Sequence, residues 1–441
     1  MPVNAPIGKP TSPVGSGAIT VASATSIGVG GMMGAGLYTL VGLAASTAGP
    51  WIPVAFAVAG LVASFSVYSY AKLGARYPSR GGAAQFLIRC FGDGVISGGL
   101  NVFQFLGWVI AMALYAAGFA GYVRALLPWH TPEWSGKVIG IALIVAVVAV
   151  NLIGTKLVGR AETAVIAAEL VILLAFVVLG LSKSHPARFD AGGGYGWLGV
   201  VFAAGLLFVT YEGFGVVTNS AGEMRNPGKQ LPRAMYLALV IVVAVYVLVS
   251  AVVVMTLSLP AIEANQGHVL SEAGRAVLGQ VGFVVIGVAA LLATASGVNA
   301  TMFGDANLAY LVATSGQMPK NFARNVWLGG TGGLFIAAGL TALFVLFFPL
   351  SAIGQMASLA FLLIYATVSA GHCRVRKETG ANPLLLAVGV AMNGALFVLM
   401  LGYTIHTGPA STWITLIVVL VCSFGLEVGY RRVTGRRFVL D

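Results

Sequence analysis

The stretch SIGVGGMMGAGLY, residues 26–38, is the most informative part of this chain, because it places five glycines among nine residues inside an apolar run. Glycine is a poor helix former and costs roughly 0.5–1 kcal/mol per interior position relative to alanine. Close helix packing is one explanation, since Gly30 and Gly34 have the spacing of a small-residue contact motif. A second interrupted run, FVTYEGFG at residues 208–215, favours the other explanation. Both runs are predicted to be helices broken near their centres.

The composition of the chain is that of a membrane protein. Of its 441 residues, 58% are hydrophobic and 8% are charged, whereas a soluble domain carries about 25% charged residues. The 62 residues between Lys9 and Lys72 contain no charged side chain, and neither do the 49 residues between Arg324 and Arg374. Each of these gaps fits two membrane spans of about 20 residues and a turn. The chain is therefore predicted to be an all-α integral membrane protein.

Hydropathy divides the chain into twelve predicted transmembrane helices. They cover residues 18–48, 51–71, 94–123, 138–155, 161–181, 196–220, 234–259, 278–304, 328–348, 351–371, 383–404 and 411–430. With the amino terminus in the cytoplasm, 19 lysine and arginine residues fall in inner loops and 5 in outer loops. This asymmetry is the one that the positive-inside rule expects. We therefore predict a multi-pass protein of the cell membrane with both termini in the cytoplasm.

The two interrupted runs lie in spans 1 and 6, which correspond to each other if spans 1–5 and 6–10 are inverted repeats. Such a pair of interruptions indicates a transporter with its binding site near the membrane midplane. A half-helix that starts near Gly34 directs N–H groups at a cavity, which suits a carboxylate. Carbonyl groups freed at Met32 and Phe208 suit an ammonium group. An α-amino acid carries both groups.

Several further motifs follow in an order that is typical of one transporter family. They are GAGLY at 34–38, YSYAKLGA at 68–75, GTKLVGRAE at 154–162, NPGKQLPRA at 226–234 and NAT at 299–301. On these motifs the chain resembles the amino acid–polyamine–organocation transporters, and most closely the archaeal proton-coupled transporters of the ApcT type. The resemblance covers spans 1–10 and extends into the last two spans.

The resemblance implies a LeuT-type fold of five-plus-five inverted repeats with broken helices 1 and 6, two additional helices, and alternating access to one central site. It divides the chain into a cytoplasmic N-terminal segment (1–17), a transport core (18–371, with repeats 18–181 and 196–371), two additional transmembrane helices (383–430) and a basic cytoplasmic tail (431–441). Carried over by position, the amides of Ala35 and Gly36 hold the substrate carboxylate. The carbonyls of Met32 and Phe208, with Tyr211 nearby, face the amino group. The predicted substrate-binding residues are Met32, Met33, Gly34, Ala35, Gly36, Phe208, Val209, Tyr211 and Glu212.

Glu169 is the predicted coupling group. It lies inside the apolar run AAELVI at 167–172, and a charged side chain at a helix centre costs about 2.5–3.5 kcal/mol on insertion scales. A neutral packing role is the alternative. Transporters of the ApcT type carry a lysine here, so Glu169 reverses the charge at this position. The carboxyl could bind protons itself, or it could join a sodium site. In this fold that site uses the carbonyls of Gly30 and Met33 with the hydroxyls of Thr294 or Ser296. We favour the proton.

Two further acidic residues lie in apolar spans. Glu212 is in the second interrupted run, where the resembled transporters carry an apolar residue. It is predicted to bind a cationic amine, to titrate alongside Glu169, or to be satisfied by the backbone of span 1. Asp305, near the cytoplasmic end of span 8, is predicted to be solvated or paired.

The predicted function is secondary active transport of amino acids, by proton symport and alternating access. The alternatives are a sodium-coupled symporter and an exchanger of amino acids or polyamines. No cofactor is expected beyond the coupling ion, which is H⁺ or, in the alternative, Na⁺. The expected partners are an amino acid and the lipid bilayer. Nucleic acid is not expected, because the basic residues lie in short loops. An enzyme is not expected either, since the chain has no HExxH motif. The oligomeric state does not follow from the sequence.

Overall fold

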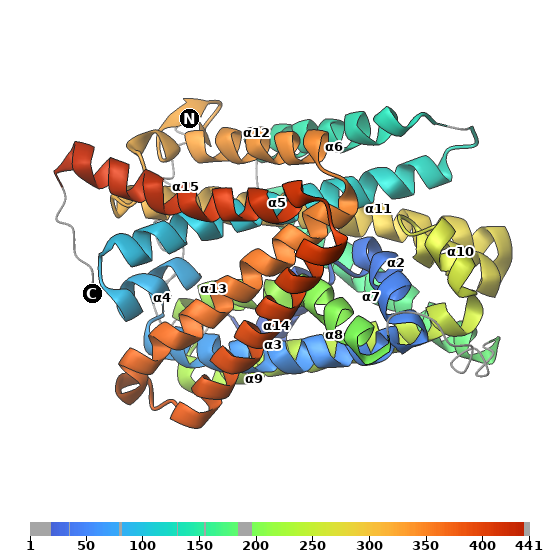
Figure 1. The fold of residues 1–441 in the computed structure, drawn as a ribbon, viewed down its shortest axis with the longest axis horizontal. Coiled ribbons are helices and arrows are strands. Elements are labelled where there is room, and N and C mark those ends of the chain that lie inside the picture. Colours follow the sequence, from blue (N-terminus) through green and yellow to red (C-terminus); the bar gives the residue numbers. More distant parts are fainter. Residues whose placement is uncertain are drawn as a thin grey trace.

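The computed structural model of the chain is a bundle of long, closely packed helices (Figure 1). It describes residues 19–34, 36–78, 82–129, 131–153, 156–183 and 196–435, and side chains are not described for residues 156–162. Several predicted features lie wholly or partly outside the described residues. They are the N-terminal segment 1–17, residues 436–441 of the basic tail, Ala35 of the substrate site, and residues 154–155, which end the span predicted at 138–155 and begin the motif at 154–162.

Helices make up nearly all of the described chain. The α-helices are α1 (Val21–Met33), α2 (Gly36–Ala48), α3 (Ile52–Arg76), α4 (Gly82–Phe91), α5 (Val95–Leu126), α6 (Glu133–Ile153), α7 (Lys156–Ser182), α8 (Gly196–Leu207), α9 (Pro227–Thr256), α10 (Leu259–Ala264), α11 (Val269–Thr314), α12 (Gly332–Phe347), α13 (Leu350–Thr379), α14 (Pro383–Thr407) and α15 (Ala410–Thr434). The 3₁₀ helices are η1 (Gly49–Trp51), η3 (Phe208–Glu223) and η4 (Lys320–Phe322). Strands β1 (Asn325–Trp327) and β2 (Gly330–Thr331) form one short antiparallel hairpin.

The predicted all-α membrane architecture is confirmed. Within the described chain, ten helical segments are long and apolar enough to cross a membrane, judged by length and composition. Two shorter apolar helices, α1 and α12, coincide with parts of predicted spans 1 and 9. The number of twelve crossings stays a prediction.

The predicted start of span 9 is wrong. Residues up to Thr331 belong to the β1–β2 hairpin, and α12 begins at Gly332. The hairpin turn places Leu328 at φ 47° and Gly329 at φ 83°, a backbone region that favours glycine. The hairpin residues before the turn include Val326 and Trp327, so the apolar run continues through the turn and hydropathy alone does not mark its end.

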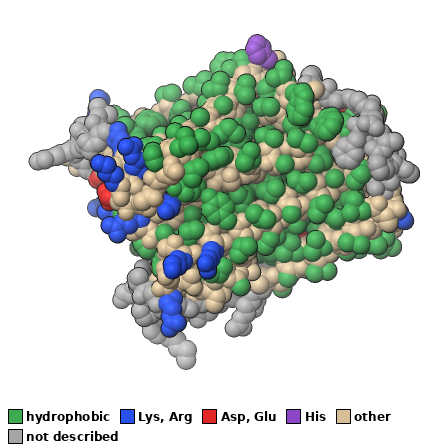
Figure 2. Space-filling view, turned by 90° about the horizontal axis from the view of Figure 1, so that it is seen from below, with side chains coloured by type: hydrophobic (Ala, Val, Ile, Leu, Met, Phe, Trp, Pro, Cys, Tyr) green, Lys and Arg blue, Asp and Glu red, His purple; other side chains and the backbone are tan. Residues whose placement is uncertain are grey.

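Lysine and arginine side chains gather at one end of the bundle (Figure 2). There the final turns of α3, α13 and α15 lie near the short helix α4. The guanidinium of Arg374 on α13 lies over the ring of Phe91 on α4, 5.1 Å from its centroid. We call this end the basic end; α10 lies at the opposite end (Figure 1). The positive-inside rule predicts that the basic end faces the cytoplasm.

A buried ionic network holds α15 in place at the basic end. Arg431 is almost fully buried, pairs with Glu427 on its own helix, and donates to Asp93, with an N–O distance of 3.0 Å. Gln317, which follows α11, also donates to Asp93 at 3.0 Å, and Asn101 of α5 donates to Gln317 at 2.6 Å. Removing one partner of a buried ion pair costs about 3–5 kcal/mol. The network therefore fixes α15 against α5 and the end of α11.

Cys90 of α4 offers a chemical test of packing at the basic end. Its side chain is buried beneath α13, where a Cβ added at Gly371 would lie 2.8 Å from the Cys90 Cβ. Burial raises the pKa of the Cys90 thiol to about 12. Because the thiolate is the reactive form, we expect almost no reaction with a maleimide at pH 7. Below the pKa, the thiolate fraction rises tenfold per pH unit, so we expect labelling to be about 100-fold faster at pH 9 than at pH 7.

The measurement follows labelling by mass spectrometry in a variant whose Cys373 and Cys422 are replaced by serine. These are the other two cysteines of the chain. Reaction of Cys90 at pH 7 at the rate of an exposed thiol, whose pKa is about 8.5, would contradict the packing of α4 described here.

Candidate substrate and coupling site

The interruption in span 1 lies where the sequence predicts it. Helix α1 ends at Met33 and α2 begins at Gly36. Gly34, at the end of α1, packs against the middle of α11. A Cβ added there would lie 3.4 Å from the Cα of Gly297 and 3.9 Å from the carbonyl oxygen of Ala293. The break in span 1 therefore lies against the backbone of α11, where an added Cβ would make ordinary van der Waals contacts.

Span 6 changes its helix type at the predicted residue but does not unwind. Helix α8 ends at Leu207, and the chain continues from Phe208 as the 3₁₀ helix η3. A 3₁₀ helix pairs each carbonyl with the N–H three residues further on, so the change in geometry does not leave a stretch of unpaired backbone. The hydroxyl of Thr210 also donates to the Leu207 carbonyl at 2.7 Å. The expectation of a freed Phe208 carbonyl is therefore corrected for this conformation.

Helices α1, α2 and η3 meet through glycines. A Cβ added at Gly213 of η3 would overlap the carbonyl group of Gly31 in α1. A Cβ added at Gly36, the first residue of α2, would lie 2.8 Å from the Cα of Thr210 in η3. Backbone therefore touches backbone on both sides of the break. The predicted substrate residues of spans 1 and 6 are brought together, and in this conformation they contact one another directly.

Tyr246 of α9 links the two interrupted spans. Its hydroxyl donates to the Met32 carbonyl at 2.7 Å and lies 3.4 Å from the Thr210 carbonyl. A phenol has one proton to donate, so the two carbonyls share it. The Met32 carbonyl is consequently not free, which corrects the sequence-based expectation. The predicted amine neighbour Tyr211 directs its hydroxyl elsewhere, to the Phe56 carbonyl of α3 at 3.0 Å.

Glu169 of α7 is within electrostatic reach of this link. Its side chain is 3% exposed, and its Oε1 atom has no hydrogen-bond partner among the described residues. The carboxyl interacts electrostatically with the phenols of Tyr38 and Tyr246. Ile166, one turn earlier on α7, fills the space beside Gly30 of α1. The predicted coupling residue is thus buried within electrostatic reach of Tyr38 and of the hydroxyl that joins α1 to η3.

Glu212 of η3 is buried in a second polar cluster. Its side chain is 2% exposed. The Tyr115 hydroxyl of α5 donates to its Oε1 atom at 3.2 Å, and the Tyr365 hydroxyl of α13 donates to its backbone carbonyl at 2.8 Å. Its Oε2 atom has no partner within the described part of the chain. The expectation that the backbone of span 1 satisfies this carboxyl is wrong, because its hydrogen-bond donor is a phenol from α5.

The predicted sodium ligands lie on α1 and on the part of α11 that faces the break. Thr294 is fully buried, and its hydroxyl donates to the Ala290 carbonyl at 2.6 Å. Ser296 is half-buried. Met33 of α1 and the predicted substrate residue Val209 of η3 are fully buried. In the described ranges, no group of three or more His, Cys, Asp or Glu side chains is placed to hold a metal ion. A sodium site of carbonyls and hydroxyls stays a prediction.

Asp305 of α11 contradicts the expectation of a solvated or paired carboxylate. Its side chain is 1% exposed, and neither carboxyl oxygen has a hydrogen-bond partner among the described residues. The prediction fails because span 8 was expected to end at residue 304, whereas α11 continues to Thr314. Asp305 therefore lies inside the bundle, more than two turns from the helix end.

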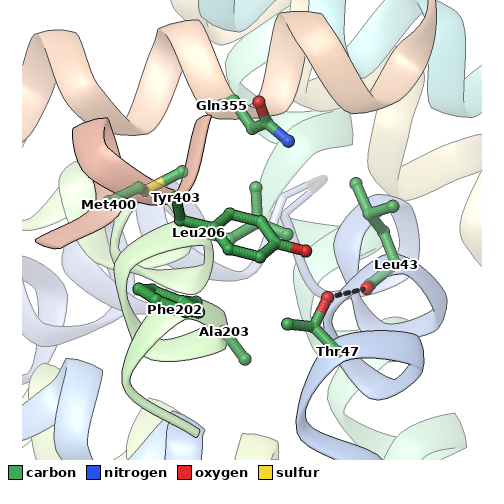
Figure 3. Close-up of a pocket in the computed structure, with 8 residues that line it drawn as sticks. All are labelled: Leu43, Thr47, Phe202, Ala203, Leu206, Gln355, Met400 and Tyr403. Atoms are coloured by element: carbon green, nitrogen blue, oxygen red, sulfur yellow. Dashed lines mark hydrogen bonds between the residues drawn. The ribbon is translucent and has the colours of Figure 1, made fainter. Parts of the chain in front are cut away.

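A small cavity lies between α2, α8, α13 and α14 (Figure 3). Its volume of about 40 Å³ gives room for about three water molecules at roughly 10–15 Å³ each. Figure 3 shows the amide of Gln355 beside this space, and the Oε1 atom of that amide has no partner within the described chain. The lining residues are Leu43, Thr47, Phe202, Ala203, Leu206, Gln355, Met400 and Tyr403. None of them is a predicted substrate residue, so we interpret the cavity as a hydrated space outside the predicted site.

Residues 19–426 match the amino acid permease family. The chain belongs to this family. The permease is 33% identical over 422 residues to MJ0609 of Methanocaldococcus jannaschii, covering 94% of this chain and 95% of that protein. It is 32% identical over 367 residues to the inner membrane transport protein YbaT of Escherichia coli, covering 82% of this chain and 85% of that protein. It is 25% identical over 422 residues to the branched-chain amino acid permease BcaP of Lactococcus lactis, covering 86% of this chain and 88% of that protein.

Membership establishes the permease as a multi-pass membrane transporter for amino acids, and not an enzyme.

Sequence reasoning missed the tyrosines that hold its centre: Tyr246, Tyr115 and Tyr365. Each of them is a phenol flanked by apolar residues within its helix, as in the run IVVAVYVLVS at 241–250. A buried phenol usually finds a hydrogen-bond partner, so an isolated tyrosine at mid-span is the signal that could have identified them.

Proposed function

We propose that this permease is a proton-coupled amino acid symporter of the ApcT type. It works by alternating access, with residues 18–181 and 196–371 as inverted repeats and the basic end toward the cytoplasm. One observation carries the proposal. Glu169, a buried carboxyl, interacts with Tyr246, whose hydroxyl joins the Met32 carbonyl of α1 to the Thr210 carbonyl of η3.

Protonation of Glu169 changes the hydrogen bonding of Tyr246. An ionised carboxylate attracts the phenol proton strongly, because charge-assisted hydrogen bonds are roughly twice as strong as neutral ones. The Tyr246 hydroxyl then turns from the two carbonyls to Glu169, and α1 is released from η3. A protonated, neutral Glu169 returns the hydroxyl to the carbonyls. Proton binding therefore favours contact between α1 and η3, and proton release favours their separation.

The substrate enters when α1, α2 and η3 separate, and the renewed approach of α1 to η3 closes the site around it. The first N–H groups of α2, beginning at Gly36, and the positive end of its dipole suit the α-carboxylate. The Met32 carbonyl, which keeps a second lone pair beside the hydrogen bond from Tyr246, suits the α-ammonium group. Closure around the substrate and protonation of Glu169 support each other, which is the coupling that symport needs. The name of the relative BcaP, a branched-chain amino acid permease, supports an amino acid as the substrate.

Uptake into proteoliposomes tests the proposal. Purified permease is reconstituted, and a proton gradient and a sodium gradient are imposed separately while uptake of radiolabelled leucine, alanine and lysine is measured. One pH unit, acidic outside, supplies about 1.4 kcal/mol per proton. With one proton per substrate, we therefore expect about tenfold accumulation of at least one amino acid, and its collapse when a protonophore is added.

Three results would overturn proton symport. A strict requirement for the sodium gradient would indicate a sodium symporter with ions near Gly30 and Thr294. Uptake that needs only counter-substrate inside the vesicles would indicate an exchanger. Uptake that merely equilibrates, whatever the gradient, would exclude coupling altogether. Liposomes without protein are the control for leakage of each amino acid.

A further inference from the structure

Glu212 and Asp305 form a second group of buried carboxyls that the proposed coupling does not use. They come from different elements, η3 and α11, and their carboxyl groups interact electrostatically. Both side chains are at least 98% buried. Three of their four carboxyl oxygens, Oε2 of Glu212 and both oxygens of Asp305, have no hydrogen-bond partner within the described chain. Neither residue forms an ion pair with a described lysine or arginine.

Glu212, one member of this acidic pair, is surrounded by phenols and aromatic rings. Tyr115 and Tyr365 direct their hydroxyls at Glu212. Tyr70 is also buried and within electrostatic reach of the same carboxyl, yet its hydroxyl has no partner among the described residues. The rings of Tyr70, Phe214 and Tyr365 lie with their centroids 5.0–5.4 Å apart. The Tyr70 hydroxyl and the Oε2 atom of Glu212 are thus left without partners beside these rings, and both oxygens of Asp305, within electrostatic reach of Glu212, are without partners as well.

This chemistry suits an organic ammonium ion. Buried charges are normally paired, so the acidic pair is incomplete without a cation or protons. A primary ammonium group has three N–H donors and no acceptor, which matches the three unpaired carboxyl oxygens. Aromatic rings add attraction for a cation that lies within about 6 Å of a ring centroid. A neutral side chain would leave all of these oxygens without a partner.

The position of Glu212 fits the reach of a basic side chain. Thr210 of η3 touches Gly36, the residue whose amide is proposed to hold the substrate carboxylate. Glu212 follows two residues later, about 4 Å along a helix that rises about 2 Å per residue. An extended chain of four methylene groups and a terminal nitrogen spans about 6 Å. A substrate anchored at the break can therefore place a terminal ammonium at the acidic pair.

We propose that Glu212 and Asp305 recognise the side-chain ammonium group of a basic amino acid. The permease then carries substrates of the lysine and ornithine type in preference to neutral amino acids. This inference rests on the proposed function for the location of the α-carboxylate and α-ammonium groups. It adds the substrate class, which neither the helix break nor Glu169 determines.

The test compares lysine with norleucine, which has the same carbon chain without the terminal ammonium. Uptake of each radiolabelled amino acid into proteoliposomes gives two values of kcat/KM for the wild-type permease. We expect a preference for lysine of at least tenfold, and competition with lysine uptake by ornithine at similar concentrations. Equal or better uptake of norleucine by the wild type would overturn the inference without reference to any variant.

The variants Glu212→Gln and Asp305→Asn locate the preference. We expect the lysine-to-norleucine ratio to fall to near one in both, because lysine uptake drops while norleucine uptake persists. Glu263→Gln, on the exposed side of α10, removes a carboxylate away from the site and serves as the matched control. A thermal unfolding scan of each purified variant identifies loss of fold. An unchanged ratio in both folded variants would overturn the assignment.

The two proposals fail in different ways. If norleucine and lysine both accumulate under a proton gradient to the same extent, the substrate class is wrong and proton symport stands. If lysine is preferred but only equilibrates or exchanges, the acidic pair stands and proton coupling is wrong.

Discussion

Replacement of Glu169 by glutamine is expected to abolish proton-driven accumulation of substrate while leaving exchange of substrate intact. Glutamine has nearly the same shape as a protonated glutamate but cannot release a proton. In Glu169→Gln the Tyr246 hydroxyl therefore stays directed at the Met32 and Thr210 carbonyls, as it is in the structure described here. Closure around a substrate remains possible, but the external pH no longer changes its free energy. The variant behaves as an exchanger.

The measurement compares two assays on the same proteoliposomes. Under a gradient of one pH unit we expect accumulation to fall from about tenfold to none, whereas counterflow against internal substrate keeps a rate within a few-fold of wild type. Glu263→Gln, whose side chain is exposed on α10, is the control for loss of a carboxylate. Undiminished accumulation in Glu169→Gln would assign the coupling to another group, with Glu212 and Asp305 the next candidates.

The sequence predicts the fold and the break in span 1 because both depend on local composition. Long uncharged runs indicate spans wherever they occur, and the glycines at 28–36 weaken one helix whatever packs against it. The burial of Glu169 follows in the same way, since several apolar residues flank it on both sides. These are properties of one segment, and each can be derived from that segment alone.

The contacts that hold the site together could not be derived in this way. The hydrogen bond from Tyr246 to Met32 joins residues 214 positions apart, and the bond from Tyr365 to Glu212 joins residues 153 positions apart. No periodic pattern in the sequence relates the two residues of either pair. The helix type of η3 and the length of α11 also depend on tertiary packing. The predicted freed carbonyls and the predicted solvated or paired Asp305 are therefore among the expectations that fail.

Replacement of Gly213 by alanine is expected to reduce transport at least tenfold in a permease that still folds. The added Cβ would overlap the carbonyl group of Gly31 and lie 2.5 Å from the amide nitrogen of Met32. Backbone atoms cannot rotate away as a side chain can, so α1 and η3 must separate and the bond from Tyr246 to Met32 weakens. A closure step made less favourable by 1.4 kcal/mol slows about tenfold. Gly31→Ala, whose Cβ would lie 2.9 Å from the Gly213 oxygen, is expected to have a smaller effect.

Gly394→Ala separates this steric effect from the general effect of alanine on helices. Gly394 lies inside α14, and a Cβ added there meets no atom within 4 Å. Alanine in a helix interior is favoured over glycine by up to about 1 kcal/mol, so we expect equal or higher thermal stability and an unchanged uptake rate. Initial uptake rates of the three variants, measured with equal amounts of folded protein, should decrease in the order Gly394→Ala, Gly31→Ala, Gly213→Ala. A wild-type rate for Gly213→Ala would show that transport does not require the close contact of α1 with η3. It would also contradict the role of Tyr246 as the link between them.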